Sequence, residues 1–227
     1  NYDEVAALCR KEKLNPEHLK HLKNLHVRWI ENPEEMKNEE HLTVVVSPGV
    51  PVLQTRLDSL RKFRIQSEIE FAWKWMKGES ITLTGTNGKS TTVALMEHLL
   101  NVAGIPAIAC GNFGIPLAEI LLDSRYDGHV KVIELSSFQL ETTRGIEPEV
   151  AICLAVSENH LNRYPDFESY RRAKWNLFTE NSSRAHWVVH EKEAEAGEVF
   201  KFHSLLTTVS DQLNTRGKMK LKATDKN

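Results

Sequence analysis

Apolar positions recur along the chain at two spacings, one near two residues and the other near 3.6. The first spacing is typical of strands and the second of helices, so their alternation predicts an α/β fold with a parallel sheet. From residue 80 onward the pattern predicts strands at 80–84, 106–110, 130–135, 149–155 and 186–190, with helices near 89–103, 115–123 and 166–180.

The segment before residue 78 shows a similar alternation. It predicts helices near 3–12 and 55–63 and a buried strand within "HLTVVVSP" at 41–48. The stretch "RIQSEIEFAWKWMKG" at 64–78 predicts a helix that ends at Gly78, where a second unit begins. The tail from about residue 197 turns polar and lysine-rich, which predicts a short β segment or a frayed end.

Composition indicates an ordinary globular protein of one large unit or two smaller ones. The 227 residues are 41% hydrophobic and 26% charged, with a net charge of −2 that favours neither nucleic acid nor an anionic membrane. Cys9, Cys110 and Cys153 are far apart and favour neither a disulfide framework nor a zinc site, so we expect a reducing cytoplasm. The longest apolar run, "VAICLAV" at 150–156, is far below the ~18 residues of a membrane span.

The stretch "ITLTGTNGKSTTVAL" at 81–95 predicts a phosphate-binding loop between a strand and a helix. Gly85 and Gly88 allow the backbone to curl, Lys89 supplies positive charge, and Ser90 or Thr91 offers a hydroxyl group to Mg²⁺. The common P-loop spacing would place a glycine at Leu83, so this loop is shorter. The alternative is a plain turn in which a Ser or Thr caps the helix.

Two further side chains are predicted to reach the same edge of the sheet. Glu134 ends a predicted strand and could hold Mg²⁺, although it could also be a solvated edge carboxylate. His160 follows the next predicted strand, although a lone histidine is more often a surface or capping residue. The carboxyl ends of parallel strands all lie at one edge of the sheet. Lys89, Glu134 and His160 are therefore expected to lie close together in a crevice at that edge.

Lys174 occupies an unusual position for a lysine. It shares one face of a predicted helix with Phe167, Tyr170, Leu177 and Phe178, so it lies inside an apolar stripe. One interpretation is that its stem covers apolar surface while the ammonium group reaches water. The other is an amine of lowered pKa that could be modified or could reach the phosphates.

Four motifs occur in an order and spacing that identify a family: "VVVSPGVP" at 44–51, "GTNGKSTT" at 85–92, "GNFGIP" at 111–116 and "ELSSFQLE" at 134–141. With a looser match at 158–174, "ENHLNRYPDFESYRRAK", they resemble the ATP-dependent Mur ligases of peptidoglycan synthesis. The resemblance implies a P-loop-type central ATPase domain at 78–227, preceded by an incomplete Rossmann-like domain at 1–77 that binds a uridine nucleotide.

Within that family the chain most resembles the enzymes that join D-glutamate to UDP-N-acetylmuramoyl-L-alanine. The resemblance implies that the substrate carboxylate takes the γ-phosphoryl group of ATP, and that the amine of D-glutamate then displaces phosphate from the acyl phosphate. It also implies one Mg²⁺ ion held by Ser90 and Glu134, and a second held by His160. Catalytic roles fall to Lys89, to His160 and to Lys174, which would be carbamylated.

The remaining site residues also follow from the resemblance. ATP would be cradled by the loop residues Gly85, Thr86, Asn87, Gly88, Lys89, Ser90 and Thr91. Asn112 and Ser136 would contact the muramoyl-alanine part, while Ser47, Pro48 and Gly49 would lie near the uridine nucleotide. Asn159 and Asn162 stand where the family usually has aspartates, so two negative charges near His160 are missing.

We expect the chain to be part of a longer monomeric enzyme, with little or no ligase turnover by itself. Three alternatives remain open. A folylpolyglutamate synthase-like ligase would share the phosphate loop and the amide-forming chemistry. A small-molecule kinase or a simple NTPase would transfer phosphate without forming an acyl phosphate. A nucleotide-binding module would have no catalytic activity.

Overall fold

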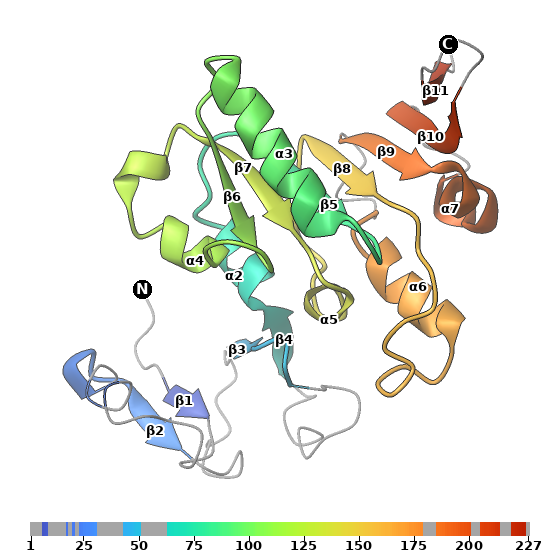
Figure 1. Ribbon diagram of the computed structural model, residues 1–227. Coiled ribbons are helices and arrows are strands. Elements are labelled where there is room, and N and C mark those ends of the chain that lie inside the picture. Colours follow the sequence, from blue (N-terminus) through green and yellow to red (C-terminus); the bar gives the residue numbers. More distant parts are fainter. Residues whose placement is uncertain are drawn as a thin grey trace. The chain divides into compact units, whose positions relative to one another are not determined.

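The computed structural model describes residues 6–8, 17, 20, 23–30, 43–50, 63–178, 185–200, 205–213 and 219–225 (Figure 1). The chain divides into two compact units. The first comprises residues 1–44 and 52–65, and the second comprises 45–51 and 66–227. The turn at 47–50 thus belongs to the larger unit. The domain roles predicted on either side of residue 77 remain predictions.

The smaller unit contains a parallel pair of short strands, β1 (Ala6–Leu8) and β2 (Arg28–Ile30). The helix predicted near 3–12 is therefore wrong at residues 6–8, where pairing with a distant strand overrides local helical spacing. The rest of that helix lies outside the described residues, as does the helix predicted near 55–63 apart from Phe63, which lies in a bend. The strand β3 (Thr43–Val46) pairs with β4 (Arg64–Ser67), and β3 lies within the segment 41–48 where a buried strand was predicted. The predicted burial is wrong for most of it, since Val46 is buried but Val45 is exposed.

The larger unit is built on a seven-stranded sheet with the order β11-β10-β9-β8-β5-β7-β6. Its strands are β5 (Ser80–Thr84), β6 (Ala107–Gly111), β7 (Val130–Glu134), β8 (Val150–Cys153), β9 (His186–His190), β10 (Leu205–Leu213) and β11 (Met219–Asp225). All neighbouring strands are parallel except β10 and β11, which are antiparallel. The predicted α/β class and parallel sheet are confirmed, and the tail is a β hairpin at one edge.

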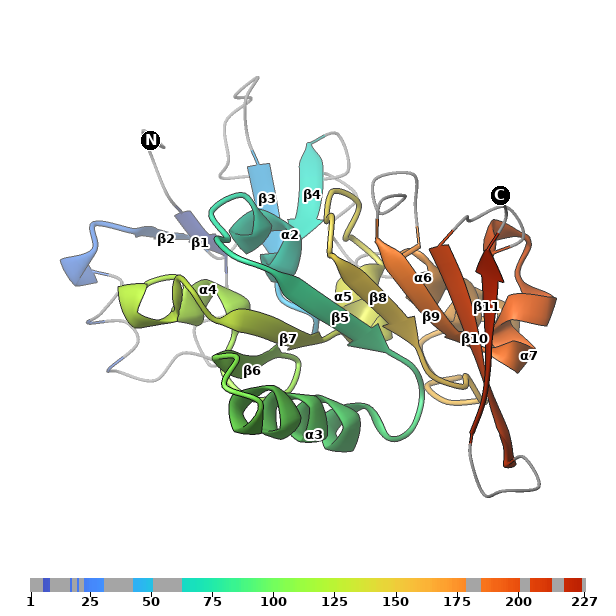
Figure 2. The ribbon, with the colours of Figure 1, turned by 90° about the horizontal axis from the view of Figure 1, so that it is seen from above.

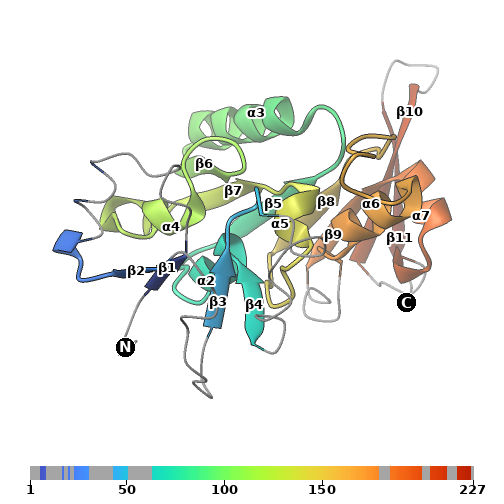
Figure 3. The ribbon, with the colours of Figure 1, turned by 90° about the horizontal axis from the view of Figure 1, so that it is seen from below.

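Helices cover both faces of this sheet. Figures 2 and 3 show α3 (Lys89–Val102) on one face, with α2 (Glu68–Trp73), α4 (Leu117–Ile120), α5 (Ser137–Leu140) and α6 (Phe167–Trp175) on the other. The helix α7 (Glu191–Ala196) follows β9. Strand residues alternate between two apolar clusters, as in β8, where Ile152 packs with α3 while Ala151 and Cys153 pack on the opposite face. This two-sided burial explains why the side chains of the central strands β5 and β7 are buried almost throughout, including polar ones such as Thr82 and Lys131.

The helices α3, α4 and α6 begin within two residues of where they were expected and end earlier. The helix predicted within 64–78 is wrong at 64–67, which form the strand β4. The helix α6 starts one residue after Asp166, whose side chain accepts a hydrogen bond from the Ser169 backbone N–H at 2.7 Å. It ends at Trp175 rather than near residue 180. The helix α2 ends at Trp73, and Gly78 instead lies in the following loop with φ +81°. Among the described residues no helix is both long and apolar enough to cross a membrane.

Candidate active site at the carboxyl edge of the sheet

The phosphate loop joins β5 to α3 and leaves the helix start open to an anion. Gly88 is the N-cap residue of α3, with φ +79°, and no described side chain caps the first turn. The alternative of a capping Ser or Thr is therefore wrong. Lys89 curls back over the loop, since its Nζ donates to the Thr86 carbonyl oxygen at 2.9 Å. Backbone N–H groups at a helix start, together with one lysine, provide a suitable site for phosphate groups.

The first glycine of the loop is required by close packing. Gly85 has φ +146°, and a Cβ atom placed on it would lie 2.7 Å from the Cβ of Leu154. We expect Gly85→Ala to lower the free energy of unfolding by ~2–4 kcal/mol, because the strain and the clash act together. Urea denaturation measures this change. Gly128→Ala is the control, since nothing lies within 4 Å of its added Cβ, and an equal loss in both variants would contradict the packing argument.

Glu134 closes β7 and is only 2% exposed, so the alternative of a solvated edge carboxylate is wrong. Its Oε2 accepts a hydrogen bond from the Ser90 hydroxyl at 2.7 Å, and its Oε1 accepts one from the Asn112 amide at 2.7 Å. The carboxylate is thereby held against the first turn of α3. A hydroxyl and a carboxylate oxygen brought together in this way match the hard oxygen ligands that Mg²⁺ prefers.

The chemistry of this pair fits a magnesium ion that also uses ligands from outside the protein. Within the described ranges, no three His, Cys, Asp or Glu side chains gather where they could hold a metal ion. An ion at Ser90 and Glu134 would therefore complete its coordination with water and phosphate oxygens, as Mg²⁺ in nucleotide sites commonly does.

His160 is held in an uncommon backbone conformation in the loop after β8. Its φ is +54°, and its backbone N–H donates to the Asn159 side-chain oxygen at 2.8 Å. The imidazole lies against Phe138, with ring centroids 4.8 Å apart. His160 is exposed overall, as the alternative of a surface histidine has it, but loss of part of the water around its imidazole lowers its pKa, and the positive charges of Lys174 and Lys89 lower it further. A neutral imidazole is the form that binds a metal ion.

Asn159 allows a direct test of the missing charge beside His160. An aspartate can accept the same backbone hydrogen bond while adding a negative charge. We expect Asn159→Asp to lower the Mg²⁺ concentration needed for half-maximal nucleotide binding by about threefold to tenfold. Titration of MgCl₂ against a fluorescent ATP analogue measures this. Asn159→Ala, which removes the acceptor, should raise this Mg²⁺ concentration. Equal Mg²⁺ concentrations for the unsubstituted protein and for Asn159→Asp would contradict the prediction.

Lys174 is buried beneath the phosphate loop. It is 2% exposed, and its Nζ donates to the Gly85 carbonyl oxygen at 2.7 Å. The alternative in which its ammonium reaches water is therefore wrong. Burial lowers the pKa of Lys174 to about 8, and the nearby charge of Lys89 adds to the effect. A useful fraction of the amine is thus neutral near physiological pH.

Tyr170 is a further component whose position in the site was not predicted from the sequence. Its hydroxyl lies 3.2 Å from the Thr86 hydroxyl, and its ring is 6.0 Å from that of His160 between centroids. The Nζ of Lys174 lies 4.6 Å from the centre of the same ring. Tyr170 therefore links the phosphate loop, the imidazole and the buried amine. The available signal was its spacing of one helical turn from Lys174.

The strand order explains why these groups meet. The strand β5 lies between β7 and β8, so the loop after β5, the end of β7 and the loop after β8 open at adjacent strand ends. The loop after β8 runs along the phosphate loop, since the Thr86 backbone N–H donates to the Ala155 carbonyl oxygen at 3.2 Å. Lys89, Ser90, Glu134, His160 and Lys174 are brought together. Asn87, Gly88 and Thr91 are exposed at the same loop and helix start.

The predicted substrate-binding residues lie in two places, one at the ends of β6 and β7 and the other in the turn at 47–50. Asn112 contacts Glu134 directly, while Ser136 forms the capping box of α5 with Gln139. Ser47, Pro48 and Gly49 lie in a turn closed by a hydrogen bond of 2.9 Å from the Val50 N–H to the Ser47 carbonyl oxygen. Their roles toward a substrate remain predictions.

Comparison with known proteins identifies the family of the chain. The family model for the Mur ligase middle domain matches residues 83–221. A UDP-N-acetylmuramoylalanine–D-glutamate ligase from Solibacter usitatus is 38% identical over 152 residues, which are 66% of this chain and 34% of that protein. A ligase of the same name from Alkaliphilus metalliredigens is 37% identical over 173 residues, which are 75% of this chain and 38% of that protein. The chain thus spans about a third of the length of these relatives.

Among solved structures, a MurF ligase from Thermotoga maritima in complex with ADP has a similar fold. The TM-score is 0.54 at 16% identity, and the match covers 91% of this chain and 47% of that chain. A likeness at this identity supports the fold, while the family model and the relatives named as ligases support the assignment. The chain therefore belongs to the Mur ligase family, whose middle domain it carries.

Proposed function

We propose that the protein is an ATP-dependent ligase that adds D-glutamate to UDP-N-acetylmuramoyl-L-alanine through an acyl phosphate, in peptidoglycan synthesis in the cytoplasm. The relatives that bear the name of this ligase support the choice of substrates. We further propose that residues 78–227 bind ATP, that residues 1–77 contribute to binding of the uridine nucleotide, and that the protein is a monomer.

One observation carries the proposal: a buried amine of lowered pKa lies directly against a phosphate loop. Lys174 contacts the Gly85 carbonyl oxygen at 2.7 Å, beneath the same loop from which Lys89 and Ser90 extend. A loop that only binds or hydrolyses nucleotide has no need of a neutral buried lysine. Carbamylation of this amine by carbon dioxide would replace a cation with a carboxylate-like group, which suits a site that must hold divalent ions between two anionic reactants.

The residues of this chain can be assigned roles in the transfer. The N–H groups at the start of α3 bind the phosphates, and Lys89 stabilises charge on the γ-phosphoryl group as it is transferred from ATP to the substrate carboxylate, with ADP as the leaving group. Asn112 keeps the Glu134 carboxylate in place beside the Ser90 hydroxyl. One Mg²⁺ ion would be held by Ser90 and Glu134 and a second by His160. When bound, these ions would neutralise charge and so let the substrate carboxylate approach the γ-phosphate of ATP.

The second half of the reaction forms the amide. The amine of D-glutamate attacks the carbonyl carbon of the acyl phosphate, the C–O bond to phosphate breaks, and the amine loses a proton. Inorganic phosphate and ADP are the coproducts. The residues of the candidate site serve the phosphoryl transfer, and we assign none of them to D-glutamate.

The test is phosphate release by the complete protein that contains this chain. We expect release to require ATP, UDP-N-acetylmuramoyl-L-alanine and D-glutamate together. Release without D-glutamate would favour a kinase or simple NTPase, and release with folate and L-glutamate would favour a folylpolyglutamate synthase-like enzyme. Nucleotide binding without release under any of these conditions would favour a noncatalytic module. Isothermal titration of the 227-residue chain with MgATP and with the UDP substrate separately measures what this part binds.

A further inference from the structure

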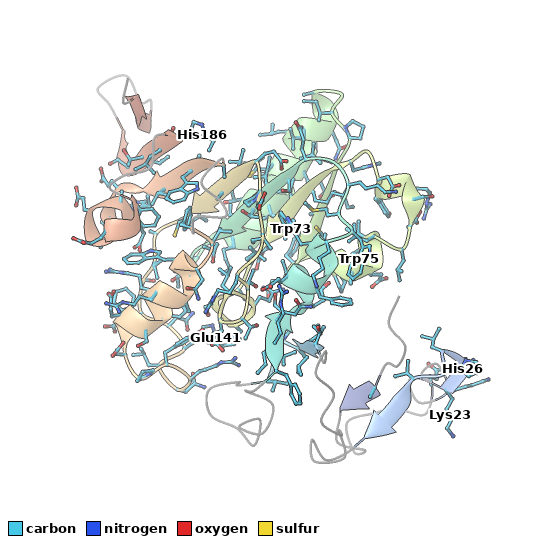
Figure 4. The ribbon with its side chains drawn as sticks, turned by 180° about the vertical axis from the view of Figure 1, so that it is seen from behind. Lys23, His26, Trp73, Trp75, Glu141 and His186 are labelled. Carbon is cyan, nitrogen blue, oxygen red and sulfur yellow. The ribbon has the colours of Figure 1, made fainter. Side chains whose placement is uncertain are left out.

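Arg163 is a partly buried cation directly after the turn that carries His160. Its backbone N–H donates to the His160 carbonyl oxygen at 2.9 Å, and its side chain is 12% exposed. The guanidinium pairs with both carboxylate oxygens of Glu141, with Nε to Oε1 at 3.1 Å and Nη2 to Oε2 at 2.8 Å. It also lies 3.9 Å from the centre of the Phe138 ring. Figure 4 labels Glu141 beside α5. Such bidentate, stacked pairing fixes the plane of the guanidinium group.

The same guanidinium reaches the turn at 47–50, more than a hundred residues earlier in the chain. Its Nη1 donates to the Pro48 carbonyl oxygen at 3.1 Å, and its Nη2 donates to the Val50 carbonyl oxygen at 3.3 Å. These contacts lie within one compact unit, which contains both 45–51 and 66–227. Only an arginine has enough donors in a rigid plane to serve one carboxylate and two carbonyl groups together.

We propose that Arg163 is a positioning residue that fixes the turn at 47–50 to the loop carrying His160. The inference rests on the proposed function, in which this turn lies near the uridine nucleotide and His160 near the reacting carboxylate. One rigid group would then set the separation between the two ends of the substrate. A substrate with the correct span from nucleotide to carboxylate would be favoured because it satisfies both ends at once.

The test compares Michaelis constants of Arg163 variants in the complete protein. We expect Arg163→Ala to raise KM for UDP-N-acetylmuramoyl-L-alanine about tenfold or more and to change KM for ATP less than about twofold. The phosphate loop has its own anchors in Thr86 and Lys174, so ATP binding should not need Arg163. The KM of Arg163→Lys for UDP-N-acetylmuramoyl-L-alanine should be intermediate, because lysine keeps the positive charge but lacks the planar set of guanidinium donors. Glu141→Gln should have the smaller effect, since both backbone carbonyl contacts remain.

Arg172→Ala is the matched control, because Arg172 pairs with Glu168 on the exposed side of α6 and is 74% exposed. An equal rise in both KM values for Arg163→Ala and Arg163→Lys would overturn the proposal, as would an unchanged KM for the UDP substrate. A purely structural role would lower the melting temperature and the active fraction without selecting one substrate.

A second measurement keeps the inference separate from the proposed function. Hydrogen exchange at the Val50 amide, which closes the turn at 47–50, should be about tenfold or more faster in Arg163→Ala than in Arg172→Ala. If the unsubstituted protein shows no release that depends on D-glutamate, the proposed function fails while this exchange test still applies. Unchanged exchange at Val50 would overturn the role of Arg163 whatever the reaction proves to be.

Discussion

Replacing Lys89 with alanine is expected to reduce ligation by ~10²–10³-fold and to weaken nucleotide binding strongly, because this ammonium extends from the phosphate loop itself. Its Nζ donates a hydrogen bond to the Thr86 carbonyl oxygen at 2.9 Å, so the charge is oriented over the loop. A lysine that stabilises the moving phosphoryl group acts more on the transition state than on bound ATP, so kcat should fall further than the nucleotide affinity.

The measurement is isothermal titration with MgATP alongside phosphate release at saturating substrates. Lys77→Ala is the control, because Lys77 is 70% exposed and pairs with Asp127 at 2.8 Å on the surface. Lys77→Ala should change the affinity for MgATP and the rate of phosphate release by less than about twofold, because a surface ion pair is screened by solvent. Lys89→Arg tests whether charge alone is enough, and we expect it to recover little activity because the longer planar group cannot occupy the same position. Full activity in Lys89→Ala would contradict the assigned role.

The sequence predicted five of the seven strands in the sheet of the larger unit, β5 to β9, because each is short and most are separated by helical patterns. For the tail, where β10 and β11 lie, it predicted only a short β segment or a frayed end. The strands β5 and β9 have the predicted bounds, and α3 begins at Lys89 as expected. The helix predicted near 3–12 is wrong at 6–8 because a parallel partner at 28–30 decides the local structure. Spacing along one segment carries no information about such a partner.

The candidate site was predictable only where a residue lies next to a strand end. Lys89 and Glu134 lie there, so strand topology alone brings them together. Arg163 could not be found this way, since its partners Pro48 and Glu141 are distant in sequence and two of its contacts are to backbone atoms. For Lys174 the apolar stripe indicated burial, but only the contact with the Gly85 carbonyl oxygen decided between the two interpretations of the lysine.

Activity is also expected to depend on carbon dioxide through Lys174. Carbamylation requires the neutral amine, which attacks CO₂ at carbon and loses a proton as the N–C bond forms. With a pKa of about 8, roughly a quarter of Lys174 is neutral at pH 7.5, against about a thousandth for an unperturbed lysine. Because the neutral form grows as pH rises, activation by bicarbonate should increase from pH 7 to about pH 9, provided that the enzyme is assayed afterwards at one fixed pH.

Lys174→Ala should lower kcat by about 10²-fold, since the site then lacks the carboxylate-like group that supports its divalent ions. A small carboxylate such as formate should restore part of the activity, because it can occupy the space left by the side chain. Lys174→Arg should not respond to formate, since its own charged group fills that space.

The matched control is Lys131, another fully buried lysine with a lowered pKa. Its Nζ donates to the Tyr126 carbonyl oxygen at 2.7 Å, near the opposite end of β7 from Glu134. Lys131→Ala should lose stability and keep its response to bicarbonate. An unsubstituted enzyme that is fully active after rigorous removal of CO₂ would show that burial of Lys174 serves packing against Tyr170 and the loop, and not the chemistry.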